Sequence, residues 1–338
     1  MELRDVASSG APARGRGSAV LNPGNRFEDV RLHVLGEHMD QQLAEHPDGV
    51  QIITQALADD SKSIINKVVN SPDIPFNWTL NPYRGCEQGC IYCYARPTHE
   101  WLGMSSGLDF ETKIMVKHNA PGMLRRELSK PPWNGEPIVF SGVTDCYQPL
   151  EAKLKITRGC LEVCAEFNQP LSIVTKNHLV TRDIDLLAKL AAVDAVRVAI
   201  SVTTLDAKLA SMMEPRASSP KDRLRAVREL TDAGIPTMVM TAPIIPGLND
   251  REIPALLQAS AEAGAIKAGW TMMRLPYELK SLFLEWLQRC VPDKAARIEH
   301  LIREVRGGEL SDPRFGSRMR GEGKTAEAIK RMFQIYAK

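Results

Sequence analysis

The sequence has no apolar run long enough to cross a membrane. In its 338 residues no stretch approaches the roughly 20 apolar positions that a membrane-spanning helix needs. The first 30 residues also lack the apolar core of a secretory signal, since their longest apolar run is Ala19-Val20-Leu21. These absences exclude a membrane partner, and we expect the protein to be cytoplasmic.

An excess of charge of either sign is also lacking. The chain has 43 Lys and Arg against 41 Asp and Glu, which leaves a formal charge of +2. A strongly basic protein is therefore excluded, although local patches can still attract nucleic acid. Because 43% of the residues are hydrophobic and 25% are charged, the chain suits one sizeable folded core rather than a disordered or fibrous protein.

Cysteine is scarce and unevenly placed. Of seven cysteines, three fall within eight residues, namely Cys86, Cys90 and Cys93. An odd count in a reducing compartment, with one tight cluster, indicates metal ligation rather than a disulfide framework.

Composition divides the chain into four parts. Residues 1–30 are rich in Ala, Gly, Ser and Pro and predict a disordered tail, and residues 31–75 predict an N-terminal extension. Residues 76–290 carry the regular core. Residues 291–338 predict a basic, loop-like extension that ends in a short amphipathic helix, residues 326–336.

Strand-like and helix-like segments alternate through the core. The expected strands are residues 78–83, 137–141, 171–175, 196–202, 236–242 and 268–274. Between them, Ser219 and Pro220 begin a helix that Gly234 ends, and Asn249 begins another. The alternation predicts an α/β fold, a partial (β/α)6 TIM-like barrel with N- and C-terminal extensions, whose reactive residues gather at the carboxyl ends of the strands.

The cysteine cluster follows the first expected strand with the spacing C-x3-C-x2-C. Thiolates are soft ligands that suit iron–sulfur clusters and zinc. Three ligands leave one position of a four-iron cluster open, and an open position is what a site needs to activate a small molecule. Structural zinc is the alternative, with Cys146 or His99 as a fourth ligand.

This motif, with Tyr92 before its last cysteine, resembles the radical S-adenosylmethionine enzymes. Residues 81–86 (NPYRGC), 93–97 (CYARP) and 142–145 (GVTD) resemble most the spore photoproduct lyase-like branch, often labelled "DNA repair photolyase". The resemblance implies that Cys86, Cys90 and Cys93 hold three irons of a [4Fe–4S] cluster. S-adenosylmethionine would bind the fourth iron, and its reductive cleavage would give a 5′-deoxyadenosyl radical that abstracts a substrate hydrogen.

Further residues would bind S-adenosylmethionine. Thr144 and Asp145 offer oxygen acceptors to the methionine amino group, and the alternative for them is an ordinary capped turn. Lys176, at the end of the third strand, would bind the carboxylate as a point charge. Ser201 would contact the ribose, unless its hydroxyl is only packed against backbone.

The resemblance extends to two later segments. Glu214 and Arg216 bracket a proline and would contact the cofactor's charged or ribose groups; a surface ion pair is the alternative. Backbone at Ala242 would cradle the adenine, with Ile244 or Ile245 supplying apolar contacts unless they belong only to the core.

Tyr92, Tyr94 and Cys146 are the candidates for the radical chemistry itself. The resemblance implies that the two tyrosines lie by the cofactor or relay the radical, and the alternative is that they only shield the cluster. Spore photoproduct lyase has a hydrogen-donating cysteine where Gly142 stands here, so Cys146 is the candidate substitute.

We therefore expect a lyase-like radical S-adenosylmethionine enzyme that uses a reducing donor of the flavodoxin or ferredoxin type. Nucleic acid is the leading substrate class by resemblance. The alternative is a non-catalytic, metal-stabilised nucleic-acid-binding protein. The basic residues near the C-terminus, among them Arg314, Arg318 and Arg320, would attract phosphates or simply form a solvated face.

Overall fold

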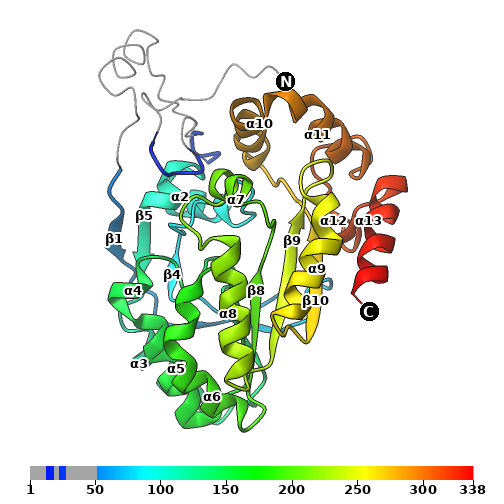
Figure 1. Cartoon of the computed structure of the whole chain (residues 1–338). Helices are drawn as coiled ribbons and strands as arrows, with labels where there is room; N and C mark the ends of the chain where they lie inside the picture. The colour runs from blue at the N-terminus through cyan, green and yellow to red at the C-terminus, as the bar shows by residue number, and fades with distance from the viewer. Residues whose placement is uncertain (1–12, 19–22, 28–51, 338) are drawn as a thin grey trace.

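The computed structural model describes residues 13–18, 23–27 and 52–337. Within these residues one seven-stranded sheet has the order β10-β9-β8-β7-β6-β3-β2 (Figure 1). Its strands are β2 (Ile65–Lys67), β3 (Trp78–Leu80), β6 (Ile138–Phe140), β7 (Leu171–Thr175), β8 (Val196–Ser201), β9 (Thr237–Ile244) and β10 (Lys267–Met272).

Six strands of this sheet, β3 and β6 to β10, run parallel, and β2 adds an antiparallel edge. This confirms the six expected strands and the partial (β/α)6 fold. Since β2 and β10 form the two edges, the sheet does not close into a full barrel.

A small second sheet supports the cysteine segment. Its order is β1 (Gln55–Ala58), β5 (Lys113–Val116) and β4 (Tyr83–Arg84). Because β4 ends two residues before Cys86, this sheet fixes the direction in which the chain enters the cysteine loop.

Helices cover the outer face of the parallel sheet and its upper end in Figure 1. Those that connect the strands are η1 (Arg96–Leu102), α2 (Leu108–Thr112), α3 (Ala120–Leu128), α4 (Glu151–Leu154), α5 (Ile156–Phe167), η2 (His178–Asp183), α6 (Ile184–Ala191), α7 (Ala207–Met213), α8 (Pro220–Asp232), η3 (Asp250–Glu252) and α9 (Ile253–Glu262). After the last strand come α10 (Leu279–Cys290), α11 (Pro292–Glu304), α12 (Ser317–Arg320) and α13 (Gly323–Tyr336). None of the described helices is long and apolar enough to span a bilayer.

Local sequence signals account for the helix ends. Ser219 Oγ accepts the backbone N–H of Asp222 at 3.2 Å, as expected for the cap of α8, and Gly234 follows its end with φ of +74°. Asn249 instead accepts the N–H of Ile245 at 2.7 Å, and the helix it precedes starts with the short turn η3.

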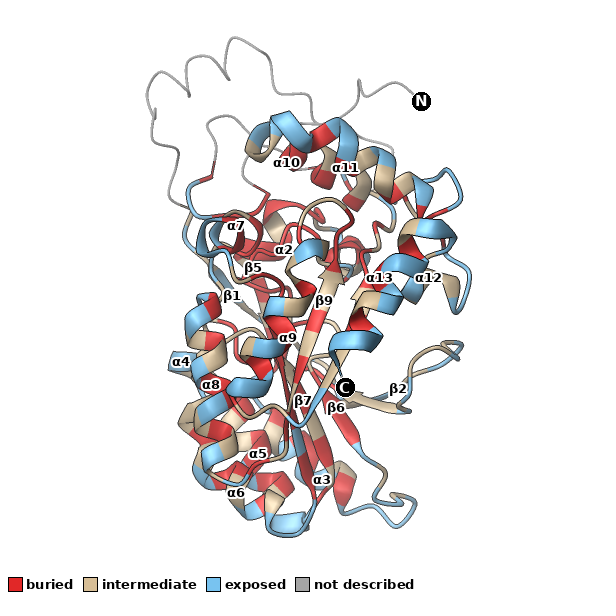
Figure 2. Cartoon of the chain, turned by 45° about the vertical axis from the view of Figure 1, so that its right-hand side comes forward, coloured by how far each residue is buried: buried red, intermediate tan, exposed pale blue. Residues whose placement is uncertain are grey.

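Two apolar clusters form most of the core (Figure 2). The larger lies between the sheet and the helices α3, α5, α6 and α8. The second joins α10 and α11 to Cys90, Ile91 and Tyr92 of the cysteine loop. The loop-like structure expected after residue 291 is therefore wrong for α11, whose apolar face packs beside that loop.

The described N-terminal segments also differ from expectation. Residues 1–12, 19–22 and 28–51 lie outside the described residues, and with them most of the expected tail and extension. Residues 13–18 and 23–27, however, pack on the core: Arg16 and Ser18 are buried, and Asn25 Nδ2 donates to the Glu100 carbonyl at 2.8 Å. A disordered tail is therefore wrong for these two segments, because their polar groups find partners in the core.

Candidate active site

The cysteine loop is held by backbone contacts from two other segments. Cys86 N–H donates to the Phe110 carbonyl at 2.9 Å, and Ile91 N–H donates to the Met213 carbonyl at 3.0 Å. The loop turns at Gly89, whose φ is +66° and whose Cβ, if present, would lie 2.7 Å from a Glu111 carboxylate oxygen. Glycine is needed here because both the backbone angle and the close approach exclude a side chain.

Arg96 braces this loop from inside the core. Its side chain is fully buried, and it donates to the carbonyls of Cys90 at 3.0 Å, Gly89 at 3.2 Å and Ser106 at 3.2 Å. It also forms a 2.5 Å ion pair with the buried carboxylate of Glu111. A planar guanidinium with five donors can satisfy all of these acceptors at once, which a lysine cannot do.

Glu111 in turn holds the N-terminal segment over the loop. Its carboxylate accepts the backbone N–H groups of Gly17 at 3.0 Å and Ser18 at 2.8 Å, and its carbonyl accepts Arg16 Nη1 at 2.8 Å. Residues 13–18 therefore form part of the wall around the cysteines.

Asp145 links three elements at the carboxyl end of the sheet. Its two oxygens accept Gln88 Nε2 at 2.8 Å, Tyr147 N–H at 2.9 Å, Thr175 Oγ1 at 2.7 Å and Lys176 N–H at 2.8 Å. Four bonds fill the acceptor capacity of a carboxylate. Asp145 therefore positions the cysteine loop against β7, and its contact with the methionine amino group stays a prediction.

Thr144 and Lys176 keep their expected places. Thr144 is buried and its hydroxyl donates to the Gly85 carbonyl at 2.5 Å, just before the first cysteine. Lys176 Nζ lies 5.8 Å from the centre of the Tyr92 ring. Within the described chain its ammonium has no carboxylate partner, so it is available to an anionic ligand beside Cys90.

A second buried ion pair holds Glu214. The Glu214 carboxylate binds Arg223, accepts the Tyr92 hydroxyl and accepts Thr203 Oγ1 at 2.9 Å. Burial raises its pKa, and the Arg223 guanidinium opposes that rise. Arg216 pairs instead with Glu87 at 3.2 Å. The alternative of a surface pair between Glu214 and Arg216 is therefore wrong, and their contacts with the cofactor stay predictions.

Ser201 and Ala242 stand at the ends of β8 and β9. Ser201 is buried, and its carbonyl accepts Arg223 Nη1 at 3.1 Å. Ala242 is half-buried on β9. Their contacts with the ribose and adenine remain predictions.

The three candidates for the radical chemistry separate in space. Tyr92 is buried against Glu214, whereas Tyr94 is half-exposed and its hydroxyl donates to the Gly142 carbonyl at 2.7 Å. Cys146 is fully buried in the larger apolar cluster, and burial raises the pKa of its thiol well above the ordinary value. Its side chain has no surface open to solvent, and its role as hydrogen donor stays a prediction.

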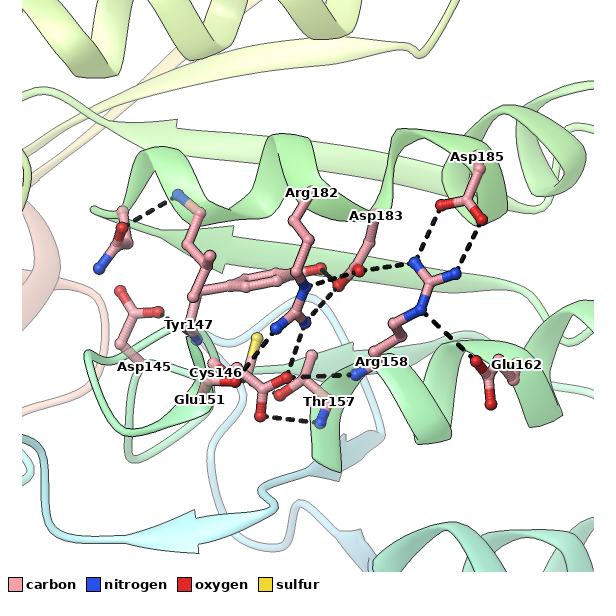
Figure 3. Close-up of polar contacts among 12 residues, drawn as sticks. Asp145, Cys146, Tyr147, Glu151, Thr157, Arg158, Glu162, Arg182, Asp183 and Asp185 are labelled. Atoms are coloured by element: carbon pink, nitrogen blue, oxygen red, sulfur yellow. Dashed lines mark hydrogen bonds and ion pairs between the residues drawn. The ribbon is translucent and has the colours of Figure 1, made fainter. Parts of the chain in front are cut away.

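A charge network lies behind the segment that carries Thr144 and Asp145 (Figure 3). Arg182 joins Glu151 at 2.8 Å and Asp183 at 2.7 Å, and Tyr147 donates to Asp183 at 3.1 Å. Glu151 also accepts the Tyr83 hydroxyl at 2.5 Å. The network therefore ties the β6–α5 connection to the strand that leads into the cysteines.

Sequence reasoning missed the buried residues that hold the loop. They are Gln88, Arg96, Glu111, Gln148, Glu151 and Arg223. Arg96 stands inside the CYARP segment, but nothing in that segment reveals that its side chain is buried. Charged residues are exposed as a rule, so a sequence gives no signal for the exceptions.

The donor set of the loop fits an iron–sulfur cluster. All seven cysteines of the chain carry free thiols, and burial together with the neighbouring thiols raises the pKa of Cys86. Cationic iron would relieve that cost, because it binds the thiolate form. The described residues contain no group of His, Cys, Asp and Glu arranged for a single ion. His99 Nε2 bonds to the Lys113 carbonyl at 2.9 Å, and Cys146 lies in the larger apolar cluster.

The partial barrel and the three-cysteine loop at its carboxyl end define an enzyme of the cluster-dependent (β/α)6 class. The Radical SAM superfamily model matches residues 80–259, more than half of the chain, and the chain belongs to that superfamily. Its members use a [4Fe–4S] cluster and S-adenosylmethionine, which are accordingly the cofactors of this enzyme.

Three comparisons place the chain among known proteins. An uncharacterized protein of Mycobacterium tuberculosis is 37% identical over 244 residues, 72% of either chain. A radical SAM Nalpha-GlyT isomerase of Pseudomonas phage M6 is 25% identical over 230 residues, 67% of this chain and 46% of the phage protein. The structure of spore photoproduct lyase complexed with dinucleoside spore photoproduct matches with a TM-score of 0.59 at 15% identity, over 83% of this chain and 78% of that one. At that identity the likeness concerns the fold alone.

Proposed function

We propose that this radical SAM enzyme abstracts hydrogen from a nucleic-acid substrate and that Cys86, Cys90 and Cys93 are its cluster ligands. The observation that carries the ligand assignment is the loop itself: three neighbouring free thiols, braced by Arg96, at the carboxyl end of a parallel sheet. When bound, the cofactors supply one-electron reduction of a sulfonium and hydrogen abstraction.

The residues of the chain bind, orient and exclude water. Lys176 would hold the carboxylate of S-adenosylmethionine, and Thr144 would accept from its amino group. Ser201 would bind the ribose and the Ala242 backbone the adenine. Tyr92 would close the site beside Cys90, and Tyr94 would face the substrate side because it is half-exposed.

Nucleic acid is supported as the substrate class by the resemblance of residues 81–86, 93–97 and 142–145 and by the shared fold. The reaction would be lyase-like, and the chain offers no exposed thiol at this place, because Gly142 has no side chain and Cys146 is buried. An electron donor of the flavodoxin or ferredoxin type would reduce the cluster.

The ligand assignment is tested by anaerobic reconstitution followed by iron analysis and a reductant-dependent cleavage assay. The wild type should bind about four irons per chain and form 5′-deoxyadenosine and methionine. Cys90→Ala should lose most of the iron and all of the cleavage. Cys290→Ala, a half-buried cysteine outside the loop, should keep both. Full iron binding by Cys90→Ala would refute the assignment.

The substrate class needs its own experiment. The reduced enzyme is incubated with DNA or RNA from cells grown in deuterated medium, and 5′-deoxyadenosine is examined by mass spectrometry. Deuterium in that product supports hydrogen abstraction from nucleic acid. Its absence with both nucleic acids, while S-adenosylmethionine is still cleaved, contradicts the substrate class. An iron-loaded protein that binds oligonucleotides but never cleaves S-adenosylmethionine is the non-catalytic alternative.

A further inference from the structure

Arg274 is a cation without a partner at the mouth of the site. It follows β10, the last parallel strand, and its guanidinium carbon lies 4.9 Å from the centre of the Tyr94 ring. Tyr94 is the neighbour of Cys93 in the chain. Among the described residues, the Arg274 guanidinium has no hydrogen bond and no ion pair.

Other arginines around the site differ in this respect. Arg96 pairs with Glu111, Arg216 with Glu87 and Arg223 with Glu214. Arg274 is half-buried, and burial lowers its pKa below the ordinary value. The Asp73 carboxylate favours the charged form of Arg274 but is paired with Arg318, so an anionic ligand in direct contact with Arg274 would offset the remaining cost of its burial.

Two further pairs of an arginine and an aromatic ring continue from Arg274 along the C-terminal segment. Arg318 lies 4.6 Å from the centre of the Phe315 ring, and Arg320 lies 4.5 Å from that of Trp270. Arg318 is close enough to Arg274 to lower its pKa. Asp73 neutralises Arg318, whereas Arg320 is bonded only to the Trp270 carbonyl at 2.7 Å. Of these three arginines, Arg274 and Arg320 therefore carry positive charge that no described carboxylate pairs with.

We propose that Arg274 binds a phosphodiester of the nucleic-acid substrate, with the exposed rings of Tyr94 and Phe315 available to stack on bases at either side. This inference rests on the proposed function and names the surface that the substrate uses. Arginine suits phosphate because its donors match two oxygens at once, and exposed aromatic rings next to cations are the usual platform for single strands. Tyr94 and Phe315 are 49% and 53% exposed.

The carboxylate of S-adenosylmethionine is the other anion at this mouth. Lys176 directly follows β7, lies against Tyr92, and already offers that carboxylate a free ammonium beside Cys90. Arg274, Arg318 and Arg320 lie progressively farther from the cysteines along the chain, and the last two belong to α12. A small cofactor bound at the cluster would have no charged group near α12. The phosphodiester is therefore the ligand that we assign.

The test uses the reconstituted holoenzyme and three variants. Arg274→Met keeps an apolar side chain on Tyr94 but removes the charge. Arg274→Lys keeps the charge but lacks the paired N–H donors of the guanidinium. Arg125→Met is the control, because Arg125 on α3 forms a half-exposed pair with Glu166 on α5. Affinity for fluorescein-labelled 12-nucleotide single-stranded DNA and RNA is measured at several salt concentrations, and affinity for S-adenosylmethionine is measured separately.

Arg274→Met should weaken oligonucleotide binding about tenfold. The slope of log affinity against log salt concentration should fall by about the amount that one phosphate contact contributes. Arg274→Lys should recover most of the slope, and Arg125→Met should match the wild type. Affinity for S-adenosylmethionine should not change. Unchanged oligonucleotide binding in Arg274→Met, or weakened binding of S-adenosylmethionine alone, would overturn the assignment. A wild type that binds neither oligonucleotide would instead refute the nucleic-acid function itself.

Discussion

At the scale of single residues, the buried pair of Arg96 and Glu111 should matter most to the cysteine loop. Arg96→Met leaves the Glu111 carboxylate buried without its cation and leaves several carbonyls without donors. We expect the free energy of unfolding to fall by about 3–5 kcal/mol, because an uncompensated buried charge is costly. Urea denaturation measures this loss, and iron analysis should show reduced cluster binding.

A surface pair of the same chemistry gives the control. Arg125 and Glu166 are both about half exposed, so Arg125→Met should change the free energy of unfolding by less than about 1 kcal/mol. Equal losses in Arg96→Met and Arg125→Met would contradict the bracing role of Arg96.

Tyr92 offers a second residue-scale test, which separates positioning from radical relay. Tyr92→Phe keeps the ring beside Cys90 but removes the hydroxyl that donates to Glu214. We expect a loss of about 1–2 kcal/mol in the free energy of unfolding, because a buried acceptor loses one of its donors. Iron content and the rate of 5′-deoxyadenosine formation should stay within about tenfold of the wild type, which corresponds to less than about 1.4 kcal/mol.

A relay role predicts a different pattern. In that case Tyr92→Phe would retain its iron and its stability and yet form no substrate-derived product. The discriminating measurement is therefore the substrate product together with the unfolding curve of the same preparation.

What the sequence could show at this scale was the type of ligand and its spacing. Three cysteines in C-x3-C-x2-C and an adjacent barrel strand identify the cluster loop directly. The roles of Asp145 and Glu214 could not be derived, because their partners come from distant segments: Gln88 is 57 residues from Asp145, and Tyr92 is 122 residues from Glu214. Only the tertiary structure shows that protein donors already occupy both carboxylates.

At the scale of elements, the sequence pattern predicted the strands of the parallel sheet and the helices between them, but not the shortest strands. The strands β3 and β6 to β10 are predicted because apolar runs alternate with helical periodicity, and α8 because Ser219 and Gly234 punctuate it. The strands β1, β2, β4 and β5 are two to four residues long and take their stability from partners far along the chain. Helix α11 was missed because its charged residues conceal a narrow apolar face.

An ion pair between Arg318 and Asp73 helps to hold α12 and gives an element-scale prediction. Asp73 accepts Arg318 Nε at 2.6 Å, and this hydrogen bond lowers the pKa of the Asp73 carboxyl below its ordinary value. Because the folded pKa lies below the unfolded one, the stabilisation is complete above about pH 4 and is lost as the pH falls through the folded pKa.

Asp73→Asn should therefore lower the free energy of unfolding by about 1–2 kcal/mol at pH 7, and its difference from the wild type should shrink below about pH 4. Urea denaturation at pH 7, 5 and 3.5 measures both effects. Asp194→Asn is the control, since Asp194 and Arg197 form an exposed pair that should contribute almost nothing at any of these pH values. A difference between Asp73→Asn and the wild type that persists unchanged at pH 3.5 would contradict this assignment.

At the scale of the whole molecule, distant parts of the chain meet around the cysteine loop. From the N-terminal side, Gly17 and Ser18 bind Glu111 beside the loop. From the C-terminal side, α10 contributes Trp286, whose Nε1 donates to the Met212 carbonyl at 3.0 Å, and Arg289, which donates to the Gly17 carbonyl at 3.4 Å. The strands therefore supply the site, and residues 13–18 and α10 supply part of its walls.

The contact between residues 13–18 and the cysteine loop can be tested by adding one methyl group at Gly17. A Cβ at Gly17 would lie 1.8 Å from the carbonyl oxygen of Gly89, which is backbone of the cysteine loop and cannot move aside cheaply. Gly17→Ala should therefore detach residues 13–18 from the loop while the barrel stays folded. We expect faster proteolysis near residue 17 and faster loss of iron on exposure to air, with little change in the urea unfolding midpoint. Gly15→Ala is the matched control, because a Cβ there meets no atom within 4 Å, although its φ of +67° imposes a small local strain. If Gly17→Ala resists protease and retains iron as well as Gly15→Ala does, the N-terminal segment is not a wall of the site.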